Sequence, residues 1–285
     1  MSSTNNSANV LTAGFSLLVY GYSVASLISW WLFLVPNEFL PVAVADMKPY
    51  SIETAPLASG AGQAILNNLG ATFFFGFFHS LMARKTVKKW MALPISVERS
   101  FFCLQGAFFL HMIQHCWVNV DKSLVLWTVT STPMLAKSVL ALFWAGSAIL
   151  LTATFALDHF HLFGLSQGFG VNLNGMVGLA PDSDGNGLRT RWHYKHVAHP
   201  IMTGALINLW AAPVMTPARL GLALFLTAYI GIAVVCLEEH SIRAEIGEEY
   251  DAYLAKTPRF FPFVSLTNMD VHLKVTMEKN GTKKD

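Results

Sequence analysis

The chain has 285 residues, of which 53% are hydrophobic and 13% are charged, and its mean hydropathy is +0.45. This composition lies outside the range of soluble proteins and predicts an integral membrane protein with a single domain over 1–285. The net charge of +2 comes from scattered basic residues, so the chain is not expected to bind nucleic acid. The cysteines lack CxxC spacing, which argues against a disulfide framework or a zinc site and predicts buried structural thiols at Cys103, Cys116 and Cys236.

Apolar runs follow one another along the chain, and most are near the ~20 residues that a helix needs to cross a bilayer. They cover roughly 11–35, 62–83, 99–120, 134–157, 200–212 and 218–237. The fifth run is short, and Pro213 and Pro217 after it indicate a turn, so the last two runs are expected to form a helical hairpin. The sequence predicts an all-α, polytopic membrane protein with about six apolar helices. Residues 1–10 are expected to be disordered, and 264–285 to form a polar tail.

Loop charges predict the orientation of the chain in the membrane. The segments "ARKTVKKW" (83–90) and "LRTRWHYK" (188–195) are rich in Lys and Arg, whereas the 36–61 loop has more acidic than basic residues. Because basic loops face the cytoplasm, and because the number of crossings is expected to be even, both termini are predicted to be cytoplasmic.

Polar motifs are expected to gather on this cytoplasmic side. They are "HSLMAR" (79–84), "VERS" (97–100), "LDHFHLFGLSQ" (157–167), "YKHVAHPIMTG" (194–204) and "LEEHSIRAEIGEEYDAYLAKTPRFFPF" (237–263). Polar groups near a bilayer are costly unless they have partners, so their concentration on one side predicts a site there. Residues 238–263 are expected to form a helix and loop that cap it.

The last two motifs resemble the C-terminal signature of membrane methyltransferases related to isoprenylcysteine carboxyl methyltransferase. The three upstream motifs are similar to segments of bacterial-type methanethiol S-methyltransferases. The resemblance covers roughly 65–263 and implies S-adenosylmethionine as cofactor and methanethiol as methyl acceptor, with dimethyl sulfide as product. The family usually has Arg-His-Pro where this chain has Ala198-His199-Pro200, and a Tyr at Met202. The role of that arginine passes, if it is filled at all, to Lys195, His196 or Arg191.

Such a cofactor carries an ammonium, a sulfonium and a carboxylate, so its pocket needs groups of both charges. Glu239 is the favoured carboxylate, although its spacing from Arg243 also suits an ion pair within one helix. His199 precedes Pro200 and lies at a helix start whose free N–H groups favour an anion. Aromatic shelves for the adenine and a glycine for close approach complete the expected cofactor-binding set, which is Tyr194, His196, Val197, His199, Pro200, Gly204, Glu238, Glu239, Arg243 and Phe261.

Methylation of a thiol requires removal of its proton, and a histidine titrates in the useful pH range. His79 or His159 is the expected base, with Asp158 as an orienting partner, and the sequence does not choose between the two histidines. For both, a hydrogen bond between helices is the alternative interpretation.

Other interpretations stay open at this point. One alternative is that the methyl acceptor is a prenylcysteine carboxylate or a lipid amine. Another is that the protein binds haem or has no catalytic activity. His111 and His115 lie four residues apart, which suits metal or haem ligands as well as hydrogen bonds between helices. The run "DSDGNG" (182–187) begins like an EF-hand loop but has His193 at its twelfth position, which favours an exposed turn. The Phe-rich segment 71–80 suits either a sieve against larger acceptors or plain packing, and no metal site is expected.

Overall fold

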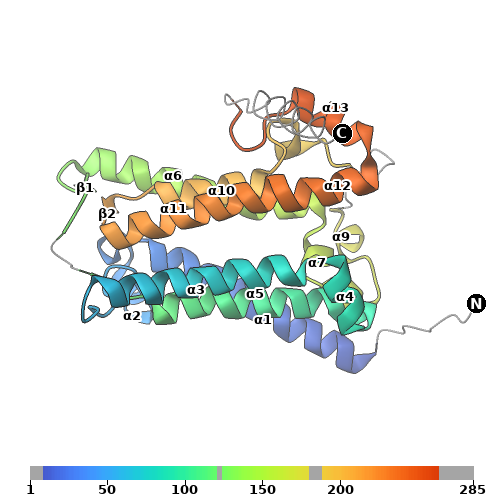
Figure 1. Ribbon diagram of the computed structural model, residues 1–285, viewed down its shortest axis with the longest axis horizontal. Helices are drawn as coiled ribbons and strands as arrows, with labels where there is room; N and C mark the ends of the chain where they lie inside the picture. Colours follow the sequence, from blue (N-terminus) through green and yellow to red (C-terminus); the bar gives the residue numbers. More distant parts are fainter. Residues whose placement is uncertain (1–8, 121–123, 180–187, 263–285) are drawn as a thin grey trace, which may run out of the picture.

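The computed structural model describes residues 9–120, 124–179 and 188–262. The "DSDGNG" turn (182–187), the 264–285 tail and residues 1–8 of the segment predicted to be disordered therefore lie outside the described residues. For the last two residues of that segment the prediction is wrong, because Asn9 caps the first helix and Val10 begins it. The described fold is all-α, with long helices arranged in two layers (Figure 1). The first layer contains α1 (Val10–Leu34), α3 (Ala61–Met82) and α5 (Ile95–Cys116), and the second contains α6 (Pro133–Leu157), α10 (Pro200–Trp210) and α11 (Pro217–Ile232).

Among the described residues, three helices are long and apolar enough to cross a membrane. They are α1, α6 and the continuous helix Pro217–Ile246, in which the π-helical segment η3 (Ala233–Glu238) joins α11 to α12 (Glu239–Ile246). The helix that contains most of the third apolar run, α5, begins at Ile95, four residues before that run. It starts directly after Pro94, because a proline cannot donate within a helix but is compatible with its start.

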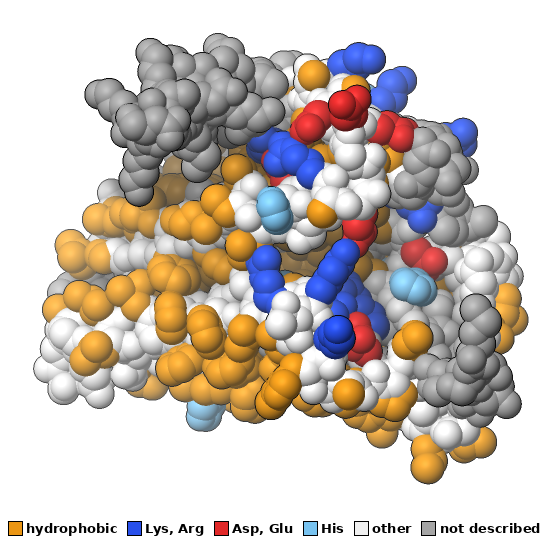
Figure 2. Space-filling model, turned by 45° about the vertical axis from the view of Figure 1, so that its right-hand side comes forward, with side chains coloured by type: hydrophobic (Ala, Val, Ile, Leu, Met, Phe, Trp, Pro, Cys, Tyr) orange, Lys and Arg blue, Asp and Glu red, His pale blue; other side chains and the backbone are white. Residues whose placement is uncertain are grey.

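Short elements gather at one end of the two layers (Figure 1). Figure 2 shows charged side chains gathered on this part of the molecule, while hydrophobic side chains cover much of the rest of the visible face. This end contains α4 (Lys85–Met91), α7 (His159–Leu162), α8 (Leu165–Phe169), α9 (Leu173–Met176), η2 (Trp192–Lys195), α12 and α13 (Glu248–Lys256). The opposite end contains η1 (Asn37–Phe39), α2 (Val42–Met47) and the antiparallel pair β1 (Trp127–Thr128) and β2 (Val214–Met215). We call the first the charged end.

Glycines allow α6 and α10 to pack closely within their layer. A Cβ atom at Gly204 would lie 2.4 Å from the Gly146 carbonyl oxygen, and one at Gly146 would lie 2.7 Å from Ile207 Cγ2. Asn208 adds a buried hydrogen bond of 2.6 Å to the Phe143 carbonyl of α6. Gly204, expected from the sequence to admit a ligand, instead admits the backbone of a neighbouring helix, so that expectation is wrong.

The two layers meet where Tyr229 of α11 packs on α3. A Cβ atom at Gly76 would lie 2.9 Å from the Tyr229 ring, and the Tyr229 hydroxyl is 3.0 Å from Ser80 Oγ. Near the opposite end, the buried Arg219 of α11 donates to the Leu34 carbonyl of α1 over 2.7 Å. These contacts hold the layers together and set the position of the charged end of α3 relative to η3.

Candidate active site

Glu239 lies at the centre of a buried ion-pair network. Its carboxylate is fully buried and accepts two hydrogen bonds from Arg259, Nε to Oε1 at 2.8 Å and Nη2 to Oε2 at 3.0 Å. Arg243 Nη2 and His199 Nε2 each lie 3.3 Å from one of its oxygens. A two-pronged pair between arginine and carboxylate is strong and geometrically specific. The sequence patterns did not predict a role for Arg259. The feature that could have indicated one is a single basic residue in the otherwise mostly apolar segment "TPRFFP" (257–262).

The segment after α13 is bound along the start of α10. The backbone N–H groups of Ala198 and His199 donate to the carbonyls of Pro258 and Arg259 over 2.8 and 2.9 Å, and Thr203 Oγ1 donates to the Phe260 carbonyl over 2.6 Å. This pairing explains how Arg259, far along the chain, reaches Glu239.

His199 lies between the two neighbouring glutamates. Its Nδ1 is 3.6 Å from Glu238 Oε1, its Nε2 is 3.3 Å from Glu239 Oε1, and the Tyr250 hydroxyl is 3.4 Å from Nε2. Burial alone lowers the pKa of His199, but hydrogen bonds to Glu238 and Glu239 outweigh it and raise the pKa to about 9. His199 is therefore protonated at neutral pH.

Glu238 and Glu239 differ in exposure, because adjacent side chains point in directions about 100° apart around a helix. The Glu239 side chain is 0% exposed, whereas that of Glu238 is 46% exposed. Both contact His199, at the point where the π-helical segment η3 passes into α12. π-helical turns are frequent at functional sites. At this one the accessible carboxylate, which we call the open carboxylate, is that of Glu238.

Other predicted cofactor residues are dispersed around this network. Tyr194 and Val197 are buried, and the Tyr194 carbonyl accepts a 2.5 Å hydrogen bond from the Tyr253 hydroxyl. Burial raises the pKa of the Tyr194 hydroxyl, so it stays neutral. His196 is exposed, and Phe261 is 39% exposed, while the neighbouring Phe260 ring lies 6.0 Å from that of His199.

Ala198, at the position of the family's usual arginine, is buried in an apolar cluster with Leu188, Tyr250 and Leu254. The basic residues expected to take over that arginine's role are Lys195, His196 and Arg191, and all three are exposed. The buried arginine of this region is instead Arg259.

The predicted pairing of His159 with Asp158 is wrong. His159 has both ring nitrogens occupied, Nε2 by the Tyr20 hydroxyl at 3.0 Å and Nδ1 by Thr154 Oγ1 at 2.7 Å. The Asp158 carboxylate accepts from the His161 N–H and caps the start of α7. Local helix-capping chemistry, which satisfies free N–H groups, determined where this carboxylate points. His159 therefore ties helices together, as the alternative interpretation expected.

His79 has the surroundings of a reactive group. Its Nδ1 is buried and, among the described residues, has no hydrogen-bond partner. The Phe75 and Phe102 rings flank the imidazole at 5.5 and 5.0 Å. Ser80, the next residue of α3, lies 3.0 Å from the Tyr229 hydroxyl of α11, so His79 lies where α3 meets the second layer.

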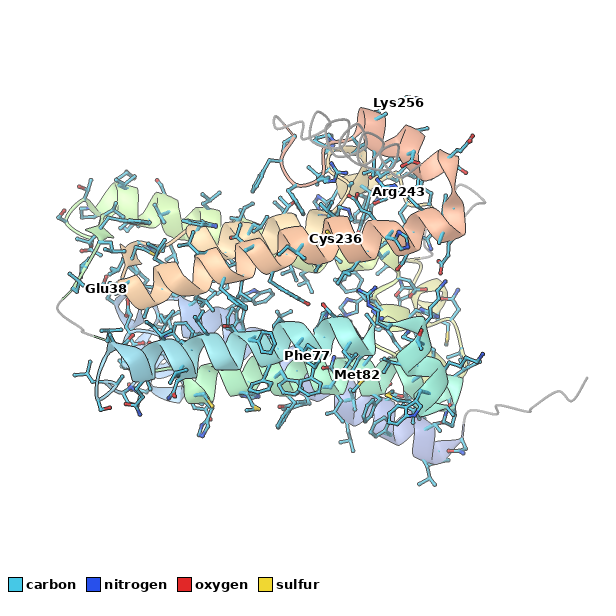
Figure 3. All side chains as sticks on the ribbon, viewed as in Figure 1. Glu38, Phe77, Met82, Cys236, Arg243 and Lys256 are labelled. Carbon is cyan, nitrogen blue, oxygen red and sulfur yellow. The ribbon has the colours of Figure 1, made fainter. Side chains whose placement is uncertain are left out.

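Figure 3 shows the two sides of this arrangement. Cys236 and Arg243 lie along the helix of the second layer, and Phe77 and Met82 lie along α3 of the first. Cys236 is exposed and Cys103 and Cys116 are partly exposed, so the prediction of buried thiols is wrong. All three are free cysteines.

His111 and His115 of α5 lie away from this site and are bonded to tyrosines. The Nδ1 atoms of His111 and His115 lie 3.2 Å from the hydroxyls of Tyr22 and Tyr50, respectively. Within 9–120, 124–179 and 188–262, the His, Cys, Asp and Glu residues form no group of three or more suited to a metal ion.

Comparison with known proteins places these features in a family. The chain is 32% identical to a methanethiol S-methyltransferase of Mycobacterium tuberculosis over 249 residues, 86% of this chain and 96% of that protein. It is 35% identical to methanethiol S-methyltransferase 2 of Bradyrhizobium diazoefficiens over 216 residues, 75% of this chain and 79% of the relative. Nurim of Bos taurus is 30% identical over 183 residues, 62% of this chain and 67% of that protein.

No protein-family model and no solved structure matches the chain. The curated relatives nevertheless include methanethiol S-methyltransferases from several bacterial genera, and the alignments extend over most of both chains. The chain therefore belongs to the methanethiol S-methyltransferase family.

Proposed function

We propose that this protein is a membrane methyltransferase that converts methanethiol to dimethyl sulfide with S-adenosylmethionine as methyl donor. Its similarity to methanethiol S-methyltransferases over most of their length carries the proposal. The charged end supports it, because a carboxylate, a protonated imidazole and an unpartnered histidine lie there beside aromatic rings.

Glu238 and the start of α10 suit the charges of the donor. The half-exposed Glu238 carboxylate is available to its cationic groups, whereas the Glu239 oxygens are occupied by Arg259, Arg243 and His199. The first-turn N–H groups after Pro200 and the protonated His199 suit its carboxylate. When bound, the donor supplies a methyl group on a positively charged sulfur.

The remaining predicted residues have supporting roles in this proposal. Glu239, Arg243 and Arg259 hold His199 and the 258–260 segment in place. Tyr194 and Val197 form part of the buried wall of the proposed cofactor site, and His196 and Phe261 lie at its exposed edge. Asp158 and His159 hold α7 to its neighbours and take no part in proton transfer.

His79 is the proposed base. It accepts the proton of the thiol as the acceptor sulfur forms a bond to the methyl carbon and the bond from that carbon to the donor sulfonium breaks. The products are a neutral thioether, the neutral donor remnant and protonated His79. One positive charge therefore passes from the donor sulfonium to His79. The partial negative charge that develops on the acceptor sulfur is attracted most strongly to the sulfonium in a site of low dielectric, which the flanking rings of Phe75 and Phe102 provide.

We further propose six passes of the chain through the bilayer, with both termini in the cytoplasm and 238–262 capping the site from that side. The helices α1, α3, α5 and α6 have 22 to 25 residues, a length of roughly 33–38 Å that matches a bilayer. α10 has 11 residues, roughly 16 Å, and makes a shallow pass. The basic residues of α4 at the charged end support a cytoplasmic orientation.

Product analysis tests the proposed reaction. Membranes containing the protein are supplied with methyl-labelled S-adenosylmethionine and methanethiol, and labelled dimethyl sulfide is measured in the headspace.

His79→Ala is expected to lower turnover by roughly 10²–10⁴-fold while affinity for S-adenosylhomocysteine stays within about twofold. The deficit is expected to shrink at high pH, where free thiolate is more abundant. Exposed His240, changed to Ala, is the control and keeps its turnover. Absence of labelled product with the unchanged protein would refute the proposal.

A further inference from the structure

Two aromatic rings from two helices flank His79, and a third ring, from another helix, packs against one of them. The Phe75 ring stacks on the imidazole at a centroid distance of 5.5 Å, and the Phe102 ring of α5 lies at 5.0 Å and 51° to it. Tyr229 of α11 meets Phe75 edge-on at 6.3 Å and is held by its hydrogen bond to Ser80. Arg99 lies over the Phe102 ring, 4.8 Å from its centroid.

Most of the Phe-rich segment has no part in these ring contacts. Phe73, Phe74 and Phe77 are 54%, 49% and 47% exposed, and they pack mainly on one another and on Phe78. Phe75 alone among these four faces His79. The segment as a whole is therefore not a sieve, and any selection by size depends on rings that the fold brings together from different helices.

We infer that Phe75 and Phe102, with Tyr229 packed against Phe75, wall the thiol site and limit the length of the acceptor's alkyl chain. The inference rests on the proposed function, which places the acceptor sulfur beside His79. A sulfur that gives its proton to His79 must approach the imidazole to about 3–3.5 Å. The Phe102 and Phe75 ring centroids lie 5.0 and 5.5 Å from that of the imidazole, which are contact distances, so no alkyl group fits between His79 and either ring. The alkyl chain of an acceptor whose sulfur reaches His79 must therefore lie against these rings.

Exclusion is the effective means of selecting so small an acceptor. Methanethiol has two heavy atoms and gains at most about 3 kcal/mol on binding, which is too little for attraction alone to favour it over longer thiols. Each further methylene group would also add favourable apolar contact in an open pocket. A closed aromatic wall reverses that order, because a longer chain must displace a ring.

Phe102 offers the sharpest test, because its ring is neither stacked on His79 nor hydrogen-bonded. In Phe102→Ala, removal of the ring is expected to raise the ratio of kcat/KM for 1-propanethiol to that for methanethiol by about tenfold or more. Both thiols are measured on one preparation of the full-length protein in membranes, so the ratio does not depend on the folded fraction. If the alanine variant is not produced, Phe102→Leu is expected to shift the ratio in the same direction by a smaller factor.

Phe109→Ala is the matched control. Phe109 stacks on Phe78 at 4.7 Å between the same two helices, α5 and α3, and no ring contact joins it to His79 among the described residues. In Phe109→Ala, the ratio of kcat/KM for 1-propanethiol to that for methanethiol is expected to equal the ratio in the unchanged protein. An unchanged ratio in both Phe102 variants, or an equal rise in Phe109→Ala, overturns the inference. If the unchanged protein methylates no thiol, the proposed function fails instead.

Discussion

Glu238 and Glu239 are adjacent in the chain and have opposite surroundings. Glu239 is fully buried and bonded to Arg259, Arg243 and His199, whereas the Glu238 side chain is 46% exposed and contacts His199 at 3.6 Å. Removal of one member of a buried ion pair leaves an uncompensated charge, which costs far more than the loss of an exposed pair. The two residues are therefore expected to respond differently to the same substitution.

Glu239→Gln is expected to destabilise the protein by about 3–5 kcal/mol, because it leaves the buried Arg259 and His199 with less compensating charge. Glu238→Gln is expected to change stability by less than about 1 kcal/mol and to weaken binding of S-adenosylhomocysteine. Thermal unfolding and calorimetry in detergent measure the two effects. A stable Glu239→Gln variant that has lost ligand affinity would restore Glu239 as the cofactor carboxylate, which the sequence alone favoured.

His199 predicts a dependence of stability on pH. Its pKa in the folded protein, about 9, lies above the ordinary 6.5, so protonation favours the folded state. The contribution, on the order of 3 kcal/mol, is complete below pH 6.5 and is lost as the pH rises to about 9. The Tm is expected to fall over this window, and to fall less in His199→Gln, whereas His240→Gln keeps the full slope. Parallel Tm curves for His199→Gln and the unchanged protein would mean that His199 is neutral when folded.

At the scale of elements, the contact between α6 and α10 depends on two glycines. Gly146 and Gly204 let the backbones approach so closely that a Cβ atom on Gly204 would lie 2.4 Å from the Gly146 carbonyl oxygen. The backbone oxygen cannot move aside as a flexible side chain would, so the helices themselves would have to separate. Because α10 positions His199, this contact connects helix packing to the site.

Gly204→Ala is expected to lower stability by about 1–3 kcal/mol, because the added methyl group overpacks the contact between α6 and α10. Gly221→Ala in α11 is the matched control, since a Cβ atom there has no neighbour within 4 Å. It is expected to be neutral or slightly stabilising, as alanine favours helix more than glycine does. Comparison of Tm values in one detergent checks both. Equal Tm values for the two variants would contradict the close contact.

At the scale of the whole molecule, the charged end and the opposite end are chemically distinct. Basic residues of α4, the site and α13 lie at one end, whereas the 36–61 loop and the paired strands lie at the other. An alternation of long helices between these ends agrees with the proposed six passes.

Cysteine labelling from outside intact cells tests this orientation. In a variant with Cys103, Cys116 and Cys236 replaced by Ser, a new cysteine at exposed Thr54 is expected to react with a membrane-impermeant maleimide. A new cysteine at exposed Lys89 in α4 is expected to react only after the membrane is opened. The reverse pattern would invert the proposed topology.

The sequence by itself determined the features that depend on local periodicity and on single residue types. Apolar runs indicated the long helices, Pro200 marked the start of α10, and the motifs around His199 and Glu239 indicated the family. Each of these signals lies within a few neighbouring residues, where helix geometry and proline chemistry act directly.

Only the tertiary structure decided which of these residues are partners. Arg259 reaches Glu239 across 20 positions, Tyr20 reaches His159 across 139, and the Phe102 ring of α5 lies against His79 of α3. Sequence spacing cannot predict such pairs, because they depend on how helices cross and on which backbones glycine allows to approach. The same packing made Gly204 a helix contact, Asp158 a helix cap and Glu238 the open carboxylate.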